Sequence, residues 1–135
     1  MVIDTSALIA IVSGEPRAGD CIDAIHEAET IGMSAASFHE ASIVIDSRRD
    51  PIASRRLDEV RLNAGIHLVP FTAAQSELAR QAHRDFGRGS GSDAKLNMGD
   101  CYAYALAKEL DEPLLFIGND FIHTDLASAL EDPRP

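Results

Sequence analysis

Four acidic residues, far apart in a chain of 135 residues, occupy positions where a carboxylate can do chemistry. Asp4 follows a short apolar run and precedes an apolar helical pattern, which predicts that it lies at the carboxyl end of a strand. Asp120 closely follows the continuous apolar run Pro113–Gly118 in the same way. Ligands of open parallel α/β sheets bind at this edge, so the two carboxylates are expected to converge there.

The other two acids fall on helical patterns. Glu40 lies in the pattern Ala35–Ser47, and its neighbours three and four residues away are uncharged, so it lies beside the face that should pack on the sheet. Asp100 lies in the first turn of the pattern Asn97–Leu110, one turn before an apolar stripe. A buried carboxylate needs a cation, a donor or a proton, which favours a site role for both. The alternative is structural: a hydrogen-bond acceptor at the sheet edge, or an acid stabilised by the helix dipole.

Three polar residues are candidates for supporting roles. Ser6 follows the first acid by two residues, and it can bond an acid or a metal-bound water, or cap the first helix. Asn97 has the same ambiguity, with capping favoured. Asp125 is a substitute for the fourth acid, or a second member beside it, although an N-cap for Leu126–Leu130 is the favoured interpretation.

The donor set contains oxygen only, because none of the five histidines or two cysteines has a spacing typical of metal ligands. Three or four carboxylates suit Mg²⁺, or Mn²⁺. Mg²⁺ keeps several waters, so such a site can present an activated water to a phosphodiester and stabilise the charge on the leaving oxygen. The chemistry indicated is metal-assisted hydrolysis.

Apolar runs alternate with helical patterns along the chain, which favours a parallel sheet covered on both sides. Strands are expected at Met1–Asp4, Thr30–Ser34, Ile66–Phe71 and Pro113–Gly118. Helices are expected at Thr5–Ile11, from Pro16 onward, and at Ala35–Ser47, Pro51–Asn63, Ala73–Phe86 and Asn97–Leu110. The glycine-rich stretch 87–92 is interpreted as a mobile surface loop.

The bulk composition is typical of one soluble domain, residues 1–135, with a frayed tail at 131–135. No apolar run is long enough to span a bilayer, and no signal peptide is recognisable. Two cysteines without ligand spacing favour a reducing, cytoplasmic location.

The net charge of −10 argues against binding nucleic acid by global electrostatics, although clustered acids can be neutralised by divalent cations. The basic residues are unevenly distributed and form two groups. These are Arg48, Arg49, Arg55, Arg56 and Arg61, and then Arg80, Arg84, Arg88 and Lys95. Solvated helix faces are the simplest interpretation of both groups.

The four acids together resemble a known family. Asp4 in VIDTSAL, Glu40 in ASFHEASIVI, Asp100 in LNMGDCYAYALAKEL and Asp120 in EPLLFIGNDFIHTDL follow the order and context of PIN-domain ribonucleases, and most of all of the VapC toxins of bacterial VapBC modules. Each motif alone is weak, but four in order are fairly specific. The resemblance covers essentially the whole chain.

The resemblance implies a three-layer α/β/α sandwich with a central parallel sheet of about four to five strands. It also implies an Mg²⁺-dependent endoribonuclease that acts as the toxin of a toxin–antitoxin module. Asp4 and Asp100 then look like direct metal ligands, Glu40 like a ligand or a holder of metal-bound water, and Asp120 like the fourth acid. Many relatives have two acids in the last turn, where this chain has Gly-Asn-Asp, so Asp125 remains an alternative.

The implied partners are an RNA substrate, a VapB-type antitoxin that blocks the active site, and a second copy in a homodimer or a higher assembly with the antitoxin. Substrate contacts are expected from Arg48, Arg49, Arg55 and Arg56, or from the glycine-rich loop. One alternative function is a Rossmannoid phosphohydrolase of small phosphate esters, in which Asp4 is the nucleophile. Such enzymes have a second aspartate where this chain has Ser6, which counts against that function. The other is an inactive binding module whose acidic pocket receives an arginine of another protein.

Overall fold

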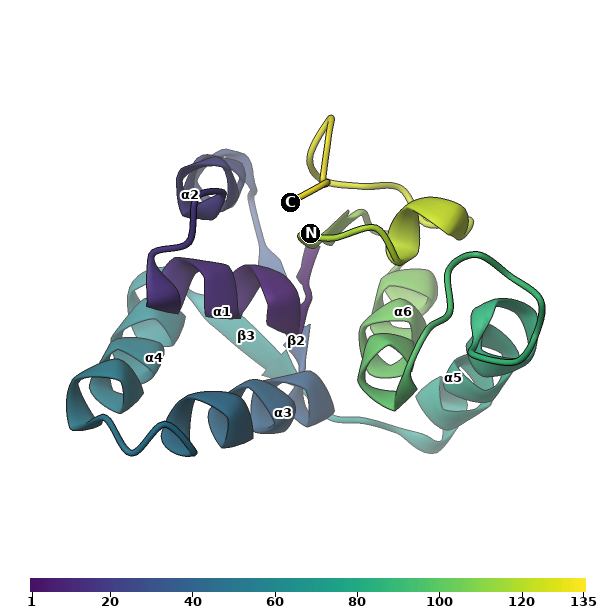
Figure 1. Cartoon of the computed structure of the whole chain (residues 1–135), viewed down its shortest axis with the longest axis horizontal. Helices are drawn as coiled ribbons and strands as arrows, with labels where there is room; N and C mark the ends of the chain where they lie inside the picture. The colour runs from purple at the N-terminus through teal and green to yellow at the C-terminus, as the bar shows by residue number, and fades with distance from the viewer.

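The computed structural model describes all 135 residues and contains a four-stranded parallel sheet between two layers of helices (Figure 1). The strands are β1 (Val2–Ile3), β2 (Ile31–Ser34), β3 (Ile66–Val69) and β4 (Leu114–Leu115), in the order β3-β2-β1-β4. The helices are α1 (Thr5–Ser13), α2 (Ala18–Glu27), α3 (Ala35–Asp46), α4 (Pro51–Asn63), α5 (Ala73–Phe86) and α6 (Met98–Leu110), followed by the 3₁₀ helix η1 (Phe121–His123). The expected three-layer α/β/α sandwich is confirmed.

Local signals in the sequence begin and end the helices that carry the site. Ser34 follows β2 and caps α3 by accepting a hydrogen bond from the backbone N–H of Ala36. Asn97 caps α6, and Thr72 caps α5 through the N–H of Gln75. The αL residue Gly14 ends α1. These caps set where each helix starts relative to the edge of the sheet.

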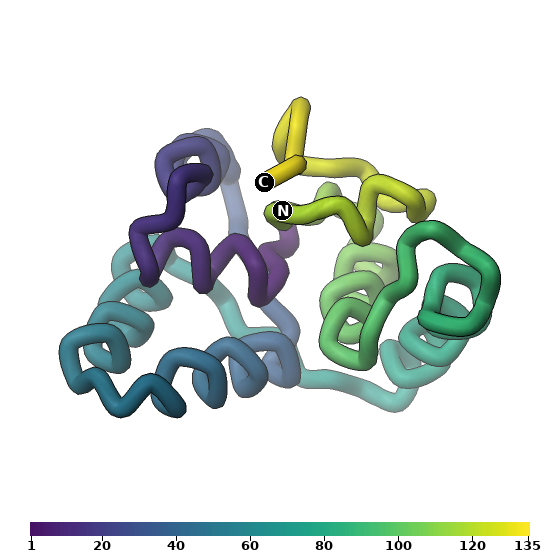
Figure 2. The backbone as a smooth tube through the Cα atoms, in the orientation of Figure 1, coloured from purple at the N-terminus to yellow at the C-terminus, as the bar shows by residue number.

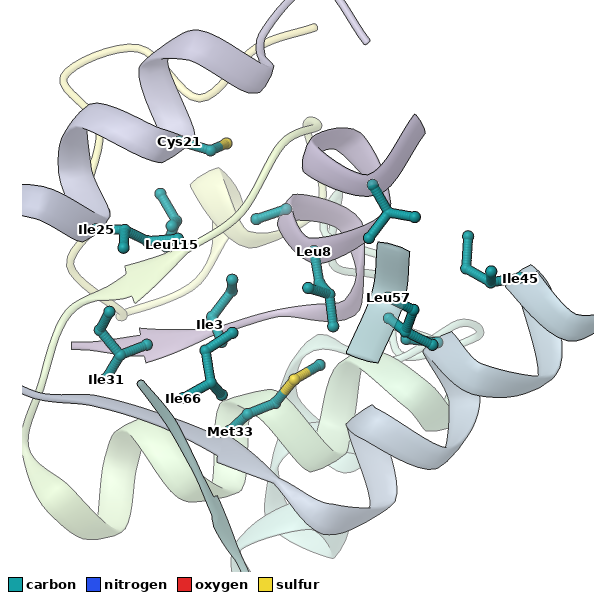
Figure 3. Packing of buried hydrophobic residues seen from close by; sticks show 13 residues of the cluster. Ile3, Leu8, Cys21, Ile25, Ile31, Met33, Ile45, Leu57, Ile66 and Leu115 are labelled. Atoms are coloured by element: carbon teal, nitrogen blue, oxygen red, sulfur yellow. The ribbon is translucent and has the colours of Figure 1, made fainter. Parts of the chain in front are cut away.

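The two faces of the sheet pack against different helices. Ile3 and Leu115 lie on the face covered by α1 to α4, as Figure 3 shows for the larger cluster. Val2 and Leu114 lie on the opposite face, against α6. Alternate residues of each strand therefore point to opposite layers. Fully burying one such aliphatic side chain contributes about 1.5–3 kcal/mol, so both layers are held firmly on the sheet.

The segment between α5 and α6 is anchored at its base. The backbone N–H of Leu96 donates to the carbonyl of Phe86 over 2.9 Å, and that of Arg88 donates to the carbonyl of Leu96 over 3.2 Å. The loop therefore leaves α5 and returns beside it before α6 begins (Figure 2).

The tail differs from the frayed segment that the sequence suggests. Pro133 is buried, and its carbonyl accepts a hydrogen bond of 2.8 Å from Gly118 N. Arg17, directly before α2, donates to the carbonyls of Asp132 and Arg134. The tail composition gave no sign of these long-range bonds. None of the helices has the length and apolar character needed to cross a lipid bilayer.

Candidate active site

Asp4 lies at the carboxyl end of β1 and forms the N-cap of α1. Its side chain is only 4% exposed, and its Oδ2 accepts hydrogen bonds from the N–H of Ser6 over 3.0 Å and from Ser6 Oγ over 2.6 Å. Ser6 Oγ also accepts a bond of 3.1 Å from the N–H of Ile117, just beyond β4. Ser6 therefore performs a structural task that the sequence left open: it fixes the first carboxylate to the end of the neighbouring strand.

Glu40 reaches the same edge from the second turn of α3, where it is half-buried. Its carboxylate packs directly against Gly99, in the first turn of α6. A Cβ on Gly99 would lie 1.9 Å from Glu40 Oε2, which no real contact allows. The absence of a side chain at Gly99 is therefore what gives the glutamate its place. Sequence reasoning missed this residue, and the available signal was a glycine in the first turn of a strong helix.

Asp100 lies in the same turn of α6 and is held by a capping box. Its backbone N–H donates to Asn97 Oδ1 over 2.9 Å, and its Oδ2 accepts a bond of 3.0 Å from the N–H of Asn97. Asn97 is therefore the N-cap of α6, as favoured from the sequence. Its side chain bonds the backbone of Asp100, and its own backbone N–H orients the carboxylate.

Burial and mutual repulsion make two of the acids unusually hard to ionise. Desolvation raises the pKa of Asp4 to about 6, with a smaller contribution from the charge of Glu40, against the lowering effect of Ser6. Desolvation also raises the pKa of Asp100 to about 7, and the charges of Asp4, Asp120 and Glu40 add to the rise. Four carboxylates from four separate segments are therefore close enough to influence one another.

The two candidates for the fourth acid have different surroundings. Asp120 is exposed, and its charge acts on Asp100. Asp125 instead accepts hydrogen bonds from Tyr104 Oη over 2.7 Å and from Lys108 Nζ over 2.6 Å. It does not cap a helix over 126–130 either, because no helix forms there.

The arginines proposed from the sequence as substrate contacts lie elsewhere. Arg48 donates to Ser13 Oγ and Arg56 to the carbonyl of Val12, both at the end of α1 opposite Asp4. At 1.5 Å per residue, that end is about 13 Å along the helix from the first acid. Arg55 is 4.0 Å from Glu59, and Arg49 is exposed in the turn after α3. This group is separated from the carboxylates by the length of α1.

The open arrangement of the oxygen donors suits a cation that keeps part of its water shell better than a cation that is fully enclosed by protein ligands. No three acidic, histidine or cysteine side chains converge tightly enough to form a ready-made metal cage. The carboxylates are nonetheless near enough to raise the pKa of Asp100, and Gly99 leaves the space that Glu40 occupies. Mg²⁺ binds through one or two carboxylates and keeps several waters, so an open cluster of oxygen donors is compatible with it.

The raised pKa values predict how stability depends on pH in the absence of metal. In the unfolded chain both carboxyls have the ordinary value of 3.8, whereas the folded values are about 6 for Asp4 and about 7 for Asp100. Between these values the folded state binds more protons, so the free energy of unfolding should fall as pH rises from about 4 to about 7. For Asp4 alone, the penalty corresponds to roughly 3 kcal/mol at neutral pH.

Urea unfolding in EDTA across this range measures the effect. The Asp4→Asn/Asp100→Asn variant should show a flatter dependence, because its amides do not titrate. Parallel curves for the two proteins would contradict the assignment of the raised pKa values to these carboxyls.

The fold and the four acids define a class of protein. The family model of the PIN domain matches residues 1–126, and the chain belongs to this family. Ribonuclease VapC28 of Mycobacterium tuberculosis is 51% identical over 131 residues, which cover 97% of this chain and 98% of the relative. Ribonuclease VapC42 of the same species is 45% identical over 129 residues, 96% of this chain and 98% of the relative. Within the PIN-domain family the chain thus falls among the VapC ribonucleases, and the resemblance stated from its motifs is confirmed.

Solved structures agree on the fold. M. tuberculosis VapC20, described as a sarcin–ricin-loop-cleaving toxin, superposes with a TM-score of 0.72 at 18% identity, covering 93% of this chain and 95% of that one. A toxin–antitoxin complex from Klebsiella pneumoniae gives a TM-score of 0.69 at 15% identity, covering 97% of this chain and 98% of the matched chain. At these identities the likeness concerns the fold alone.

Proposed function

We propose that this VapC-type chain is an endoribonuclease toxin that hydrolyses RNA phosphodiester bonds with a divalent cation, Mg²⁺ or Mn²⁺, at Asp4, Glu40, Asp100 and Asp120. The observation that carries the proposal is the convergence of carboxylates from separate segments at one edge of the sheet. Glu40 packs against Gly99, directly before Asp100, and the charges of Asp4, Asp120 and Glu40 all act on Asp100. Such a concentration of negative charge disfavours the empty site and favours a bound cation. Neither the small-phosphate hydrolase nor the inactive binding module is favoured by the VapC relatives.

Each residue of the site has a separate task in this proposal. Asp4 and Asp100 ligate the ion, and Glu40 ligates it or holds one of its waters. Ser6 holds Asp4 in place through two hydrogen bonds, and Asn97 orients Asp100 through the capping box. When bound, the ion supplies positive charge that stabilises the transition state and lowers the pKa of the attacking water.

The proposal includes partners and a compartment. An antitoxin with a cationic side chain can neutralise the acidic cluster and block it, and the Klebsiella structure of the same fold is a toxin–antitoxin complex. A homodimer, alone or within an assembly with the antitoxin, is also proposed from the family. The buried, unpaired thiols of Cys21 and Cys101 support a reducing cytoplasm.

Cleavage of a total-RNA pool by the purified protein tests the function. We expect discrete fragments with Mg²⁺, and none with EDTA or with the Asp4→Asn variant. A folded, antitoxin-free protein that binds Mg²⁺ and cleaves no RNA in the pool would overturn the proposal and favour the binding module.

The fourth acid can be identified by comparing two neutralising substitutions. Asp120→Asn should reduce cleavage by about 10²-fold or more, because it removes a charge beside the ion. Asp125→Asn should leave cleavage within about threefold, because its carboxylate is engaged by Tyr104 and Lys108. Initial rates at saturating Mg²⁺ measure both. The reverse order of effects would make Asp125 the functional acid.

A further inference from the structure

A pocket lies beside the acidic site, between α5 and α6. It has a volume of about 620 Å³ and is lined by Arg80 and His83 of α5, by Arg88 of the following loop, and by Asn97 and Met98 at the start of α6. We call it the α5–α6 pocket. Pockets of this size accommodate a small organic group such as a nucleotide.

The α5–α6 pocket adjoins the carboxylates through its α6 wall. Asn97 exchanges two hydrogen bonds with Asp100, and Met98 directly precedes Gly99, against which Glu40 packs. A ligand in the pocket therefore lies next to the cluster of acids, so that one strand of RNA can contact both.

The pocket also carries arginine side chains, Arg80 and Arg88, that make no ion pair within the chain. Seven of the twelve Lys and Arg side chains make a hydrogen bond, an ion pair or a cation–π contact. The other five are Arg49, Arg80, Arg84, Arg88 and Lys95, and four of them fall between residues 80 and 95. In a chain of net charge −10, this is where positive charge remains free to meet a phosphate.

The wall facing these cations is apolar and aromatic. Phe71 and Tyr102 line the pocket as an edge-to-face pair, with ring centroids 4.9 Å apart and an interplanar angle of 72°. Met98 stands beside them with 72% of its surface exposed. Proteins bind unpaired bases by combining such aromatic surfaces with cations that follow the backbone.

We propose that the α5–α6 pocket binds one unpaired nucleotide of the RNA that flanks the cleaved bond. Its base packs against Tyr102 and Met98, and its phosphate is bound by Arg80 and Arg88. The backbone bridge between Gly87 and Leu96, where the two ends of the loop meet, holds Arg88 in position. The inference rests on the proposed function. It places the RNA contact in the helix layer of α5 and α6, and not at the arginines of α3 and α4 that were expected from the sequence.

The binding of a fluorescein-labelled single-stranded oligoribonucleotide of mixed sequence, followed by anisotropy with Mg²⁺, tests the proposal. All proteins carry Asp4→Asn, so that binding is measured without cleavage. The added substitution Arg80→Ala/Arg88→Ala should raise Kd by about tenfold or more. It should also reduce the slope of log Kd against log salt by about 1.4, since each phosphate contact of a single strand contributes about 0.7.

The matched control is Arg84→Ala/Lys95→Ala, which removes the same charge from the same segment without changing the pocket lining. Its Kd should rise less than about threefold, as expected for screened charges at a distance. Tyr102→Leu should weaken binding by about fivefold or more without changing the salt slope, because it removes a stacking surface and no charge.

Three results would overturn the proposal. One is equal weakening by the pocket and control variants, which reveals only a general charge effect. Another is a larger loss of RNA affinity in Arg48→Ala/Arg49→Ala than in Arg80→Ala/Arg88→Ala. The third is unchanged RNA affinity together with a change of oligomeric state in sedimentation, which would make the pocket an interface between copies. The proposed function is judged separately, by cleavage with an intact Asp4.

Discussion

Replacing Asp100 by asparagine should strongly reduce RNA cleavage and, at neutral pH without metal, should raise the melting temperature. The carboxyl is half-buried, and its pKa of about 7 reflects desolvation and repulsion from neighbouring acids. An amide removes both penalties and still accepts the hydrogen bond from Asn97. A gain of about 1 kcal/mol in a domain of this size raises the melting temperature by roughly 3–6 °C. Cleavage should fall by about 10³-fold, because several kcal/mol of charge stabilisation is lost with the ion.

Thermal melts in EDTA and in saturating Mg²⁺ separate the two effects. The wild-type protein should gain stability when Mg²⁺ is added, since a ligand that binds only the folded state stabilises it, and Asp100→Asn should gain much less. Asp93→Asn is the matched control, because Asp93 is exposed and its carboxylate makes no hydrogen bond or ion pair. If Asp100→Asn melts at a lower temperature than the wild type in EDTA, the Asp100 carboxylate stabilises the fold rather than straining it.

Gly99→Ala should damage the site even though alanine favours helices. The new Cβ would lie 1.9 Å from Glu40 Oε2 and 2.6 Å from its carboxyl carbon, so either the glutamate or the start of α6 must move. Overpacking of this kind costs about 1–3 kcal/mol of folding free energy. Displacing one carboxylate by about an ångström should reduce cleavage by about 10²-fold.

Gly19→Ala provides the control on another helix. A Cβ at this exposed position of α2 meets nothing within 4 Å, so the substitution should stabilise the helix by about 0.5–1 kcal/mol, with cleavage unchanged. Combining Gly99→Ala with Glu40→Ala should restore stability but not cleavage, because the clash disappears together with the acid. If Gly99→Ala matches Gly19→Ala in both assays, the packing of Glu40 against α6 has no role.

Helices were the most predictable elements, because their signals are local. Pro51–Asn63 and Ala73–Phe86 were predicted at the bounds that the structure has, from Pro51 and a glycine at the ends of one and from Thr72 before the other. The lengths of the strands were harder to predict. The apolar run Pro113–Gly118 contributes only Leu114–Leu115 to the ladder, because its neighbour β1 is itself only two residues long and because Leu114 makes no more than a single bridge, to Ser128, on the other side.

The candidate acids were predictable because each combines charge with a position that should face the sheet. Their surroundings were not, because these depend on contacts between distant segments. Nothing near Asp125 in the sequence announces that Lys108 and Tyr104 will bind it. Likewise, the fit of Glu40 against Gly99 joins two helices that are separated by α4, β3 and α5.

The hydrogen bond between Ser6 and Ile117 has a consequence for protein synthesis. It joins residues 111 positions apart, and the strand that leads to Ile117 pairs with the first strand of the sheet. While a ribosome is still making the chain, Asp4 emerges long before the segment that completes its surroundings. Contacts of such long sequence separation form late in folding. The surroundings of Asp4 are therefore incomplete in a nascent chain until its last strand has left the ribosome and paired with the first.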